Sequence, residues 1–308
     1  MDSSAYPGHY RSANAYFRER FGKKLYKLAL DGGFTCPNRD GTTDTRGCIF
    51  CSGGSGDFAV PCGDNVYQAI ENAKHVVAGK GGEGYIAYFQ SFTGTYAPLS
   101  RLRELYFSAA AHPDIEAIAV GTRPDCLPDD VVDLLEELNG IKPVFTELGL
   151  QTIHAETAKY IRRGYELPVF DDAAARLKKA GLNVIVHMII GLPGETENMI
   201  VKTAKYIGRS GADGIKLQLL HVLRNTDLAA DYAEGLFKTM TQDEYIHTLE
   251  RCIENIPPEM VVHRLTGDGA KRDLIAPLWS ADKKRVLAAV NAAFDRDNIK
   301  QGSAFSCI

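Results

Sequence analysis

The chain has 308 residues, 45% of them hydrophobic, and carries a formal net charge of −4 with a sequence pI of about 6.1. This length suits one large α/β domain, or a core domain with a small appendage. The slightly acidic balance excludes a binder that depends on overall positive charge, although a local basic patch can still contact RNA.

The cysteines and the N-terminus indicate the compartment. Seven cysteines, an odd and scattered set, do not make a disulfide framework. The first residues, MDSSAYPGHYRSANAYF, lack the apolar segment of a signal peptide, and the sequence has no run of eighteen apolar residues. We therefore expect a cytoplasmic protein with reduced thiols and no membrane span.

The chain begins with an arm, residues 1–22, that is rich in tyrosine and arginine. Such an arm more often packs its rings on the surface of its own domain. The alternative is that the aromatic and basic side chains stack on bases and contact phosphates.

A short strand is predicted at 25–30, and a cysteine-bearing segment, CPNRDGTTDTRGCIFC, follows it. Its glycines indicate a loop that holds Cys36, Cys48 and Cys51. Thiolates bind soft metals, so this loop predicts an iron–sulfur cluster or zinc rather than idle thiols. Three cysteines leave one iron of a four-iron cluster without a protein ligand, and a small molecule can bind there.

Beyond the loop, strands and helices alternate. Strands are expected at 84–90, 115–120, 143–151, 183–190 and 214–223, and helices at 64–79, with Asp64 as N-cap, and at 99–111, 128–139, 155–163, 170–181 and 195–211. This alternation predicts an α/β fold with a parallel sheet, and about six such units predict a partial or full TIM-like (β/α) barrel. Active sites of such barrels lie at the carboxyl ends of the strands, where the cysteine loop falls.

The last 50 residues or so change character after IPPEM (256–260). A strand at 260–268 and a helix at 280–297 are expected there. The predicted organisation is thus an arm (1–22), a core barrel (23–258) and a small C-terminal extension (259–308).

These motifs together resemble a known family. A cysteine cluster ending in C-x-aromatic-C after the first strand resembles the radical S-adenosylmethionine enzymes, although its first spacing is longer than their usual one. TRPD (122–125), ELGLQT (147–152) and HMIIGLPGET (187–196) are similar to the branch that contains the Elongator catalytic subunit. From YKLALDGGFTCPNRDG (26–41) to the C-terminus, the chain resembles the bacterial YhcC/YtqA-type radical proteins.

The resemblance implies a chemistry. Cys36, Cys48 and Cys51 would ligate a [4Fe–4S] cluster, and S-adenosylmethionine would chelate the fourth iron. An electron from the cluster would cleave the sulfonium to methionine and a 5′-deoxyadenosyl radical, which would abstract a substrate hydrogen.

The resemblance also implies cofactor contacts. Phe50 stands where the family places an aromatic ring beside the adenine. Gln90 and Ser91 end the second predicted strand, where many relatives carry a glycine-rich motif facing the methionine amine; this chain departs from that motif. Arg163 matches an arginine that binds the methionine carboxylate, a task that suits a guanidinium fork. Its alternative is a solvated helix charge beside Arg162.

Further contacts are expected along the barrel mouth. Glu147 and Gln151 share one face of their strand by alternation, so both can face the mouth. Gly191, Pro193 and Gly194 form a tight turn near the expected adenosine. His187 is interpreted as a barrel-interior histidine. Gly121 stands where the Elongator subunit has a glutamate, so a polar contact to the cofactor is missing there or comes from elsewhere.

The leading function is modification of the tRNA wobble uridine, of the carboxymethylaminomethyl-uridine type, with a flavodoxin or ferredoxin reductase as electron donor. No acetyltransferase domain is recognised, so the full Elongator reaction is not carried over. One alternative is radical chemistry on a small metabolite or protein. Another is a structural zinc protein that binds nucleic acid, with Cys62 as a fourth ligand. Basic clusters at 176–179, 271–272 and 283–285 could together mark an RNA surface.

Overall fold

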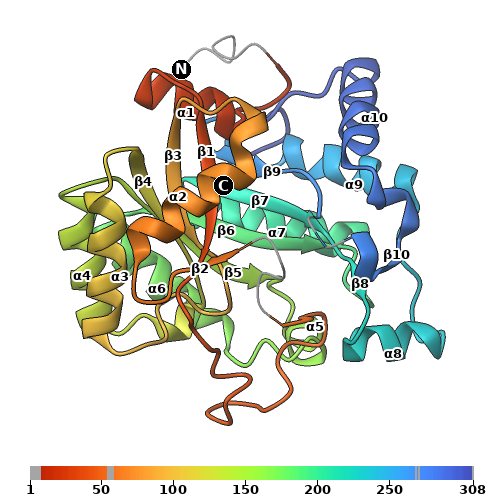
Figure 1. Ribbon diagram of the computed structural model, residues 1–308. Helices are drawn as coiled ribbons and strands as arrows, with labels where there is room; N and C mark the ends of the chain where they lie inside the picture. Colours follow the sequence, from red (N-terminus) through yellow and green to blue (C-terminus); the bar gives the residue numbers. More distant parts are fainter. Residues whose placement is uncertain (1–7, 54–58, 268, 270, 307–308) are drawn as a thin grey trace.

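The computed structural model describes residues 8–53, 59–267, 269 and 271–306, and its centre is one sheet of eight strands (Figure 1). In spatial order the strands are β2 (Val60–Pro61), β1 (Leu25–Asp31), β3 (Gly84–Phe89), β4 (Ile115–Thr122), β5 (Val144–Gln151), β6 (Asn183–Ile190), β7 (Gly214–Leu219) and β9 (Val261–Arg264). Every neighbouring pair is parallel. The α/β fold with a partial (β/α) barrel is confirmed.

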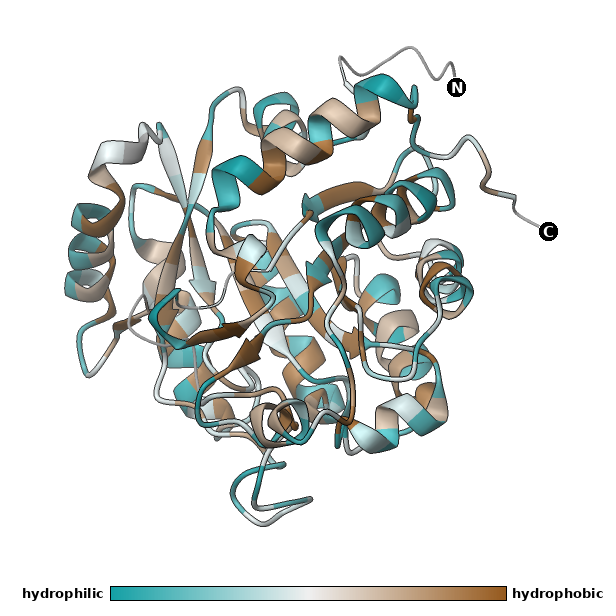
Figure 2. Ribbon diagram, turned by 90° about the vertical axis from the view of Figure 1, so that its right-hand side faces the viewer, coloured by the Kyte–Doolittle hydropathy of each residue, from teal (hydrophilic) through white to brown (hydrophobic). Residues whose placement is uncertain are grey.

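Helices cover the outer face of the sheet. They are α2 (Val66–Val77), α3 (Leu99–Ala111), α4 (Asp129–Asn139), α6 (Leu167–Lys179), α7 (Glu197–Arg209) and α9 (Gln242–Glu254). The short α5 (Ala155–Tyr160) lies instead at the carboxyl end of the barrel, where Tyr160 packs in a small cluster with Ile49 of the cysteine loop (Figure 1). In α4, the buried side chains recur at helical spacing, which gives the helix one apolar face for the sheet. Figure 2 shows the resulting pattern, with hydrophobic residues gathered on the central strands.

The two faces of each strand serve different cores. Leu28 and Leu30 of β1 point outward into the main core between sheet and helices. Leu25, Phe145 and their inward-facing neighbours form a second, smaller core inside the barrel. This alternation follows from the two-residue period of a strand.

The arm folds as α1 (Ala13–Phe21), which closes the amino end of the barrel (Figure 1). Phe17 is buried in the inner core, with its ring centroid 5.6 Å from that of Phe145. Arg20 donates a hydrogen bond to Asn183 at the start of β6. The packing interpretation of this segment therefore applies to α1, which lies at the end opposite the cysteine loop; residues 1–7 lie outside the described residues.

The C-terminal part of the chain contributes strands and helices to the same fold. β9, expected in a separate extension, pairs with β7 and completes the sheet. The predicted strand at 214–223 is split into β7 and β8 (Val222–Leu223), and β8 pairs antiparallel with β10 (Leu274–Ala276). α8 (Asp227–Ala233) lies between them in sequence, and α10 (Lys283–Arg296) packs on α9. The domain boundary at 258/259 remains a prediction. The pairing of β9 with β7, and of β10 with β8, does not favour it, because strands from both sides of the boundary share a sheet.

Two local predictions need correction. The N-cap of α2 is Asn65 rather than Asp64, since the Asn65 side chain accepts the Gln68 N–H. The helix expected to reach residue 163 ends at Tyr160, because Arg162 and Gly164 take left-handed conformations in a turn. Across the described residues, no helix combines the length and the apolar character that crossing a membrane requires.

Candidate functional site

The three clustered cysteines meet at a cavity of about 190 Å³. Cys36, Cys48 and Cys51 line its outer side, and residues from the strands β3 to β6 line the rest. The cavity thus lies at the carboxyl ends of the strands, where the cysteine loop was expected.

A buried asparagine holds the cysteine loop in place. The Asn38 side-chain amide donates to the carbonyl oxygens of Arg162 (2.7 Å) and Arg163 (3.2 Å), and it lies 3.5 Å from the Cys48 Sγ. Gly164 makes room for it: φ is +84°, and an added Cβ would lie 2.5 Å from the Asn38 Oδ1. The loop therefore docks on the turn after α5 through a contact that only glycine permits.

Arg123 carries one of the positive charges beside the thiols. It donates to the Arg163 carbonyl (2.8 Å) and makes two hydrogen bonds to Asp125 (2.9 and 2.6 Å). Burial raises the pKa of the Cys48 thiol to about 11, and Arg123 opposes this shift because its charge favours the thiolate. The sequence motif TRPD contains Arg123, but the interpretation of that motif did not assign this residue a role.

The donor set fits a cluster of several irons better than one zinc ion. Zinc holds its ligand atoms close around one centre. Among the described residues, the only group of possible ligand atoms all within 4.8 Å of one another is Glu71, His112 and Asp114. The ammonium of Lys74 already occupies that group, at 2.9 Å from Glu71 and 2.5 Å from Asp114. The three thiols are more widely spread around their cavity.

Two further observations concern the fit. The Thr93 hydroxyl lines the cavity, is buried and has no hydrogen-bond partner among the described residues, as expected of a group that meets a ligand. Cys62, the fourth ligand of the zinc alternative, is only 3% exposed and packs in the main core. The zinc alternative therefore lacks its fourth thiol.

Several predicted cofactor contacts share this cavity. Its lining includes Phe50, Gln90, Gln151 and Arg163. Gln151 has a left-handed backbone conformation (φ +64°), so its side chain leaves the regular strand alternation at the end of β5. The structure thus brings these four predicted residues together with the cysteines.

Arg163 also makes hydrogen bonds within the protein. It is 3% exposed, and four of its N–H groups donate to backbone carbonyls of Leu150, Thr152 and Tyr165. It is therefore no solvated helix charge, the alternative considered from sequence. Its role toward a methionine carboxylate stays a prediction, with one N–H group left for it.

Glu147 lines the floor of the cavity and is fully buried. Its carboxylate accepts hydrogen bonds from four side chains: Lys27 (2.5 Å), Tyr88 (2.5 Å), His187 (2.9 Å) and Lys216. Burial alone would raise the pKa of Glu147, but the two lysines hold it well below its usual value. His187 lies in the barrel interior, as expected. Glu147 was expected at the barrel mouth; it lines the cavity but is engaged by these four side chains, and a contact to the cofactor remains a prediction.

Four predicted contacts lie elsewhere. Ser91 is buried but is not part of this lining. Gly191, Pro193 and Gly194 line a separate hollow of about 300 Å³ with Met240. The turn after β6 faces the loop that precedes α9, so none of its three predicted contact residues borders the cysteine cavity.

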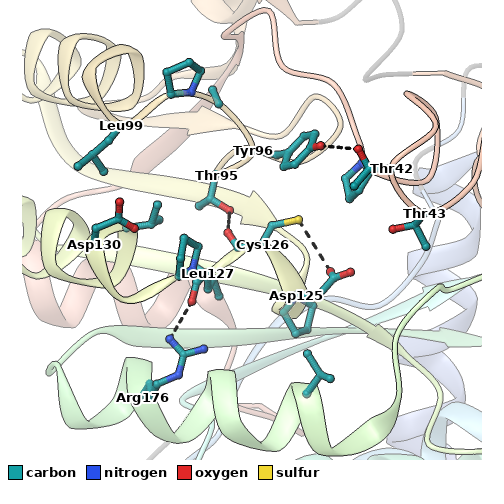
Figure 3. A pocket seen from close by; sticks show the side chains of 17 residues that line it. Thr42, Thr43, Thr95, Tyr96, Leu99, Asp125, Cys126, Leu127, Asp130 and Arg176 are labelled. Carbon is teal, nitrogen blue, oxygen red and sulfur yellow. Dashed lines mark hydrogen bonds between the residues drawn. The ribbon is translucent and has the colours of Figure 1, made fainter.

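A larger groove of about 880 Å³ lies outside the cysteine loop (Figure 3). The Tyr96 and Thr42 hydroxyls, 2.9 Å apart, join that loop to the segment after β3. Cys126, whose backbone carbonyl accepts from Thr95, forms part of the wall. The groove and the inner cavity are thus separated by the segment that carries Arg123 and Asp125.

Comparisons with known proteins identify two family profiles and a similar bacterial protein. The profile described as the Radical SAM superfamily matches residues 45–207, and that of the Radical_SAM C-terminal domain matches residues 212–296. YtqA of Bacillus subtilis is 45% identical over 298 residues, covering 96% of this chain and 92% of its own.

Two more distant similarities are to proteins of one archaeon. A tRNA uridine(34) acetyltransferase of Methanocaldococcus infernus is 27% identical over 155 residues, covering 49% of this chain and 28% of its own. The structure of the Elp3 protein of the same organism, with residues 1–46 deleted, superposes with a TM-score of 0.69 at 17% identity. It covers 90% of this chain, which spans 64% of that one, and at this identity it shows a shared fold.

Proposed function

Since this chain belongs to the radical S-adenosylmethionine superfamily, whose cofactors are a [4Fe–4S] cluster and S-adenosylmethionine, we propose that it is a tRNA-modifying enzyme acting on the wobble uridine. The observation that carries the proposal is the convergence of three cysteines at a cavity on the carboxyl side of the barrel. When bound, the cofactors supply a 5′-deoxyadenosyl radical that can abstract a hydrogen atom from a substrate.

The proposal gives this chain's residues definite tasks. Cys36, Cys48 and Cys51 hold the cluster, and the fourth iron is left to the cofactor. Phe50 would pack on the adenine, and the last free N–H of Arg163 would bind the methionine carboxylate. Gln90 and Gln151 border the same cavity, and their side chains would orient the cofactor by hydrogen bonds.

Two groups complete the environment. Arg123 stabilises the thiolates by its charge, and Asn38 fixes the loop that carries them. The cavity has a volume of only about 190 Å³, so a bound cofactor would leave little room in it for water that could react with a radical.

The substrate assignment rests on sequence similarity to the tRNA uridine(34) acetyltransferase. We assign the substrate to the carboxymethylaminomethyl-uridine type. A flavodoxin or ferredoxin reductase would deliver the electron in the cytoplasm. Radical chemistry on a small metabolite or protein is the alternative that the test must separate.

The test combines a biochemical and a cellular measurement. With dithionite, the anaerobically reconstituted protein should convert S-adenosylmethionine to 5′-deoxyadenosine. A deletion strain should accumulate a precursor of a wobble-uridine modification in its tRNA nucleosides. Cleavage of the cofactor with an unchanged nucleoside profile would contradict the tRNA assignment and favour the small-molecule or protein substrate.

A further inference from the structure

Phe92 stands at the mouth of the cysteine cavity. It follows β3, and at 36% exposure it is the most exposed of the described residues that line this cavity. The ring therefore lies where the cavity meets solvent. A substrate that remains outside a cofactor bound in the cavity can still reach this position.

The turn that carries Phe92 is fixed by its neighbours. Phe92 has a left-handed backbone conformation (φ +54°), which is strained for an aromatic residue. Ser91 and Thr93 on either side are each 1% exposed, and the Gly94 N–H donates to the Gly121 carbonyl of β4 (2.8 Å). These neighbours are buried, whereas the ring of Phe92 is left at the mouth. Strained residues of this kind occur at ligand-binding sites, where the surrounding structure keeps them in place.

Arg39 joins this ring to the cysteine loop. Its guanidinium lies 5.7 Å from the centroid of the Phe92 ring, within the range of a cation–π contact, and donates to the Cys51 carbonyl (2.6 Å). Gly47 makes room for it, because an added Cβ there would lie 2.9 Å from the Arg39 Nε. Among the described residues, Arg39 has a neutral carbonyl as its hydrogen-bond acceptor and forms no ion pair. Its positive charge is therefore available at the mouth.

The two side chains match the two parts of a nucleotide. An exposed aromatic ring stacks on a base of any sequence, and a guanidinium binds a phosphate. Both groups are held in place before a ligand arrives, so little conformational freedom is lost on binding. The site also needs no positive charge on the rest of this acidic chain, since the cation stands beside the ring.

We propose that Phe92 stacks on the substrate base at the mouth of the cysteine cavity and that Arg39 binds a phosphate of the same RNA loop. The inference rests on the proposed function, since it names the residues that receive the wobble uridine. A base has to leave the anticodon stack before chemistry on it can occur, and a ring at the mouth replaces the lost stacking.

The test uses two anticodon stem-loop RNAs that differ in one base. The first has carboxymethylaminomethyluridine at the wobble position, and the second has an abasic nucleotide there, so the phosphates are the same. Binding is measured to the anaerobically reconstituted protein with S-adenosylmethionine and no reductant, so that no turnover occurs. The parent should bind the first RNA about tenfold more tightly, as the loss of one stacked base predicts.

Substitutions of the ring locate this preference. Phe92→Ala should bring the ratio of the two affinities to about one. Phe92→Leu keeps an apolar side chain but has no aromatic face, so it should retain little of the preference, whereas Phe92→Trp should retain all of it. Tyr67→Ala is the control, because it removes a 53% exposed aromatic ring from α2, outside the cavity, and should keep the parent's ratio. Iron content, thermal unfolding and S-adenosylmethionine binding are measured for every variant.

The phosphate contact has its own measurement. Arg39→Met should weaken the binding of both RNAs equally and reduce the slope of log affinity against log salt by about 1. Lys202→Met, which removes the same charge from an exposed position of α7, should leave that slope unchanged. An unchanged slope in Arg39→Met would overturn the phosphate contact.

The contrary results for the ring are distinct. The parent's ratio in Phe92→Ala, or an equal loss of both RNAs by it, would overturn the stacking contact and leave the tRNA assignment in place. Weaker binding of S-adenosylmethionine by that variant, with the RNA ratio unchanged, would overturn it too and assign the ring to the cofactor. If neither RNA binds the parent better than an unrelated hairpin, the proposed function itself fails, and this inference fails with it.

Discussion

At the scale of single residues, the cysteines near the N-terminus fall into two environments. Cys36, Cys48 and Cys51 border a cavity, whereas Cys62 is packed in the main core and its backbone N–H donates to Asp31. Changing any of the first three to alanine should abolish iron binding, against about four irons per chain in the reconstituted parent. Cys62→Ala should keep the iron and cost about 1 kcal/mol of stability.

Iron analysis after anaerobic reconstitution measures this difference, and urea denaturation measures the stability. Loss of iron from Cys62→Ala, with a normal content in Cys36→Ala, would contradict the assignment of the ligands. Local spacing was enough to predict the three thiols. Asn38 and Arg123 could not be assigned in the same way, because their partners at 162–163 are brought near only by the fold.

His187 makes stability depend on pH. Burial and the charge of Lys216 lower its pKa to about 4, although Glu147 acts in the opposite direction. The unfolded chain protonates this histidine near pH 6.5, so between these values the unfolded state binds more protons and stability falls as the pH falls. From pH 7 to 5 the parent should lose about 1–2 kcal/mol more than His187→Gln.

Urea denaturation at both pH values gives the comparison. The exposed His75 provides the control, since His75→Gln removes a histidine outside the barrel and should retain the parent's pH dependence. The same loss in His187→Gln as in the parent would show that another group, such as His263 in the same barrel, causes the effect.

At the scale of elements, the long strands of the sheet were predicted closely because each is a short apolar run between glycines or polar turns. The two- and three-residue strands β2 and β10 were missed, and β8 was merged with β7, because so few residues carry no periodic pattern. Helices α8 and α9 were missed in the stretch after residue 223. For α9 a signal was present: Thr241 and Glu244 form a capping box at its start. The membership of β9 in the sheet could not be read from the sequence, because pairing with β7 is a long-range contact.

The docking of the cysteine loop on the turn after α5 can be tested with one methyl group. Gly164→Ala places a Cβ against Asn38 and also strains a left-handed backbone. Gly181→Ala is the matched control, since Gly181 has φ +71° but no atom within 4 Å of an added Cβ. Both changes should cost about 1–2 kcal/mol of stability from backbone strain.

Only Gly164→Ala should also displace the loop, so its cluster should be lost faster to a chelator. The rate of loss of the cluster's visible absorbance under anaerobic conditions provides the measurement. Equal rates in the two variants would mean that the Asn38 contact does not hold the loop.

At the scale of the whole molecule, the two ends of the barrel differ: a helix covers the amino end, and the cysteine cavity lies at the carboxyl end. α1 closes the amino end, so its aromatic residues cannot surround a base at the opposite, cysteine-bearing end (Figure 1). The basic cluster on α6 is also largely neutralised, because Arg176 pairs with Asp172 and Lys178 pairs with Asp213. An RNA surface is therefore better sought near the start of α10.

Lys284 and Arg285 stand exposed there, in the first turn of α10 and shortly after β10, which lies beside β8. If tRNA is the substrate, the double variant Lys284→Glu/Arg285→Glu should weaken its binding and reduce the slope of log affinity against log salt by about 2, one unit for each lost phosphate contact. Acidic residues suit a helix N-terminus, so the variant should remain folded.

The control is Lys179→Glu/Lys202→Glu, which makes the same change in net charge on exposed positions of α6 and α7 and should weaken tRNA binding less. Since the chain is acidic overall, the field that attracts RNA must be local, and an equal loss in both double variants would show that net charge alone governs binding.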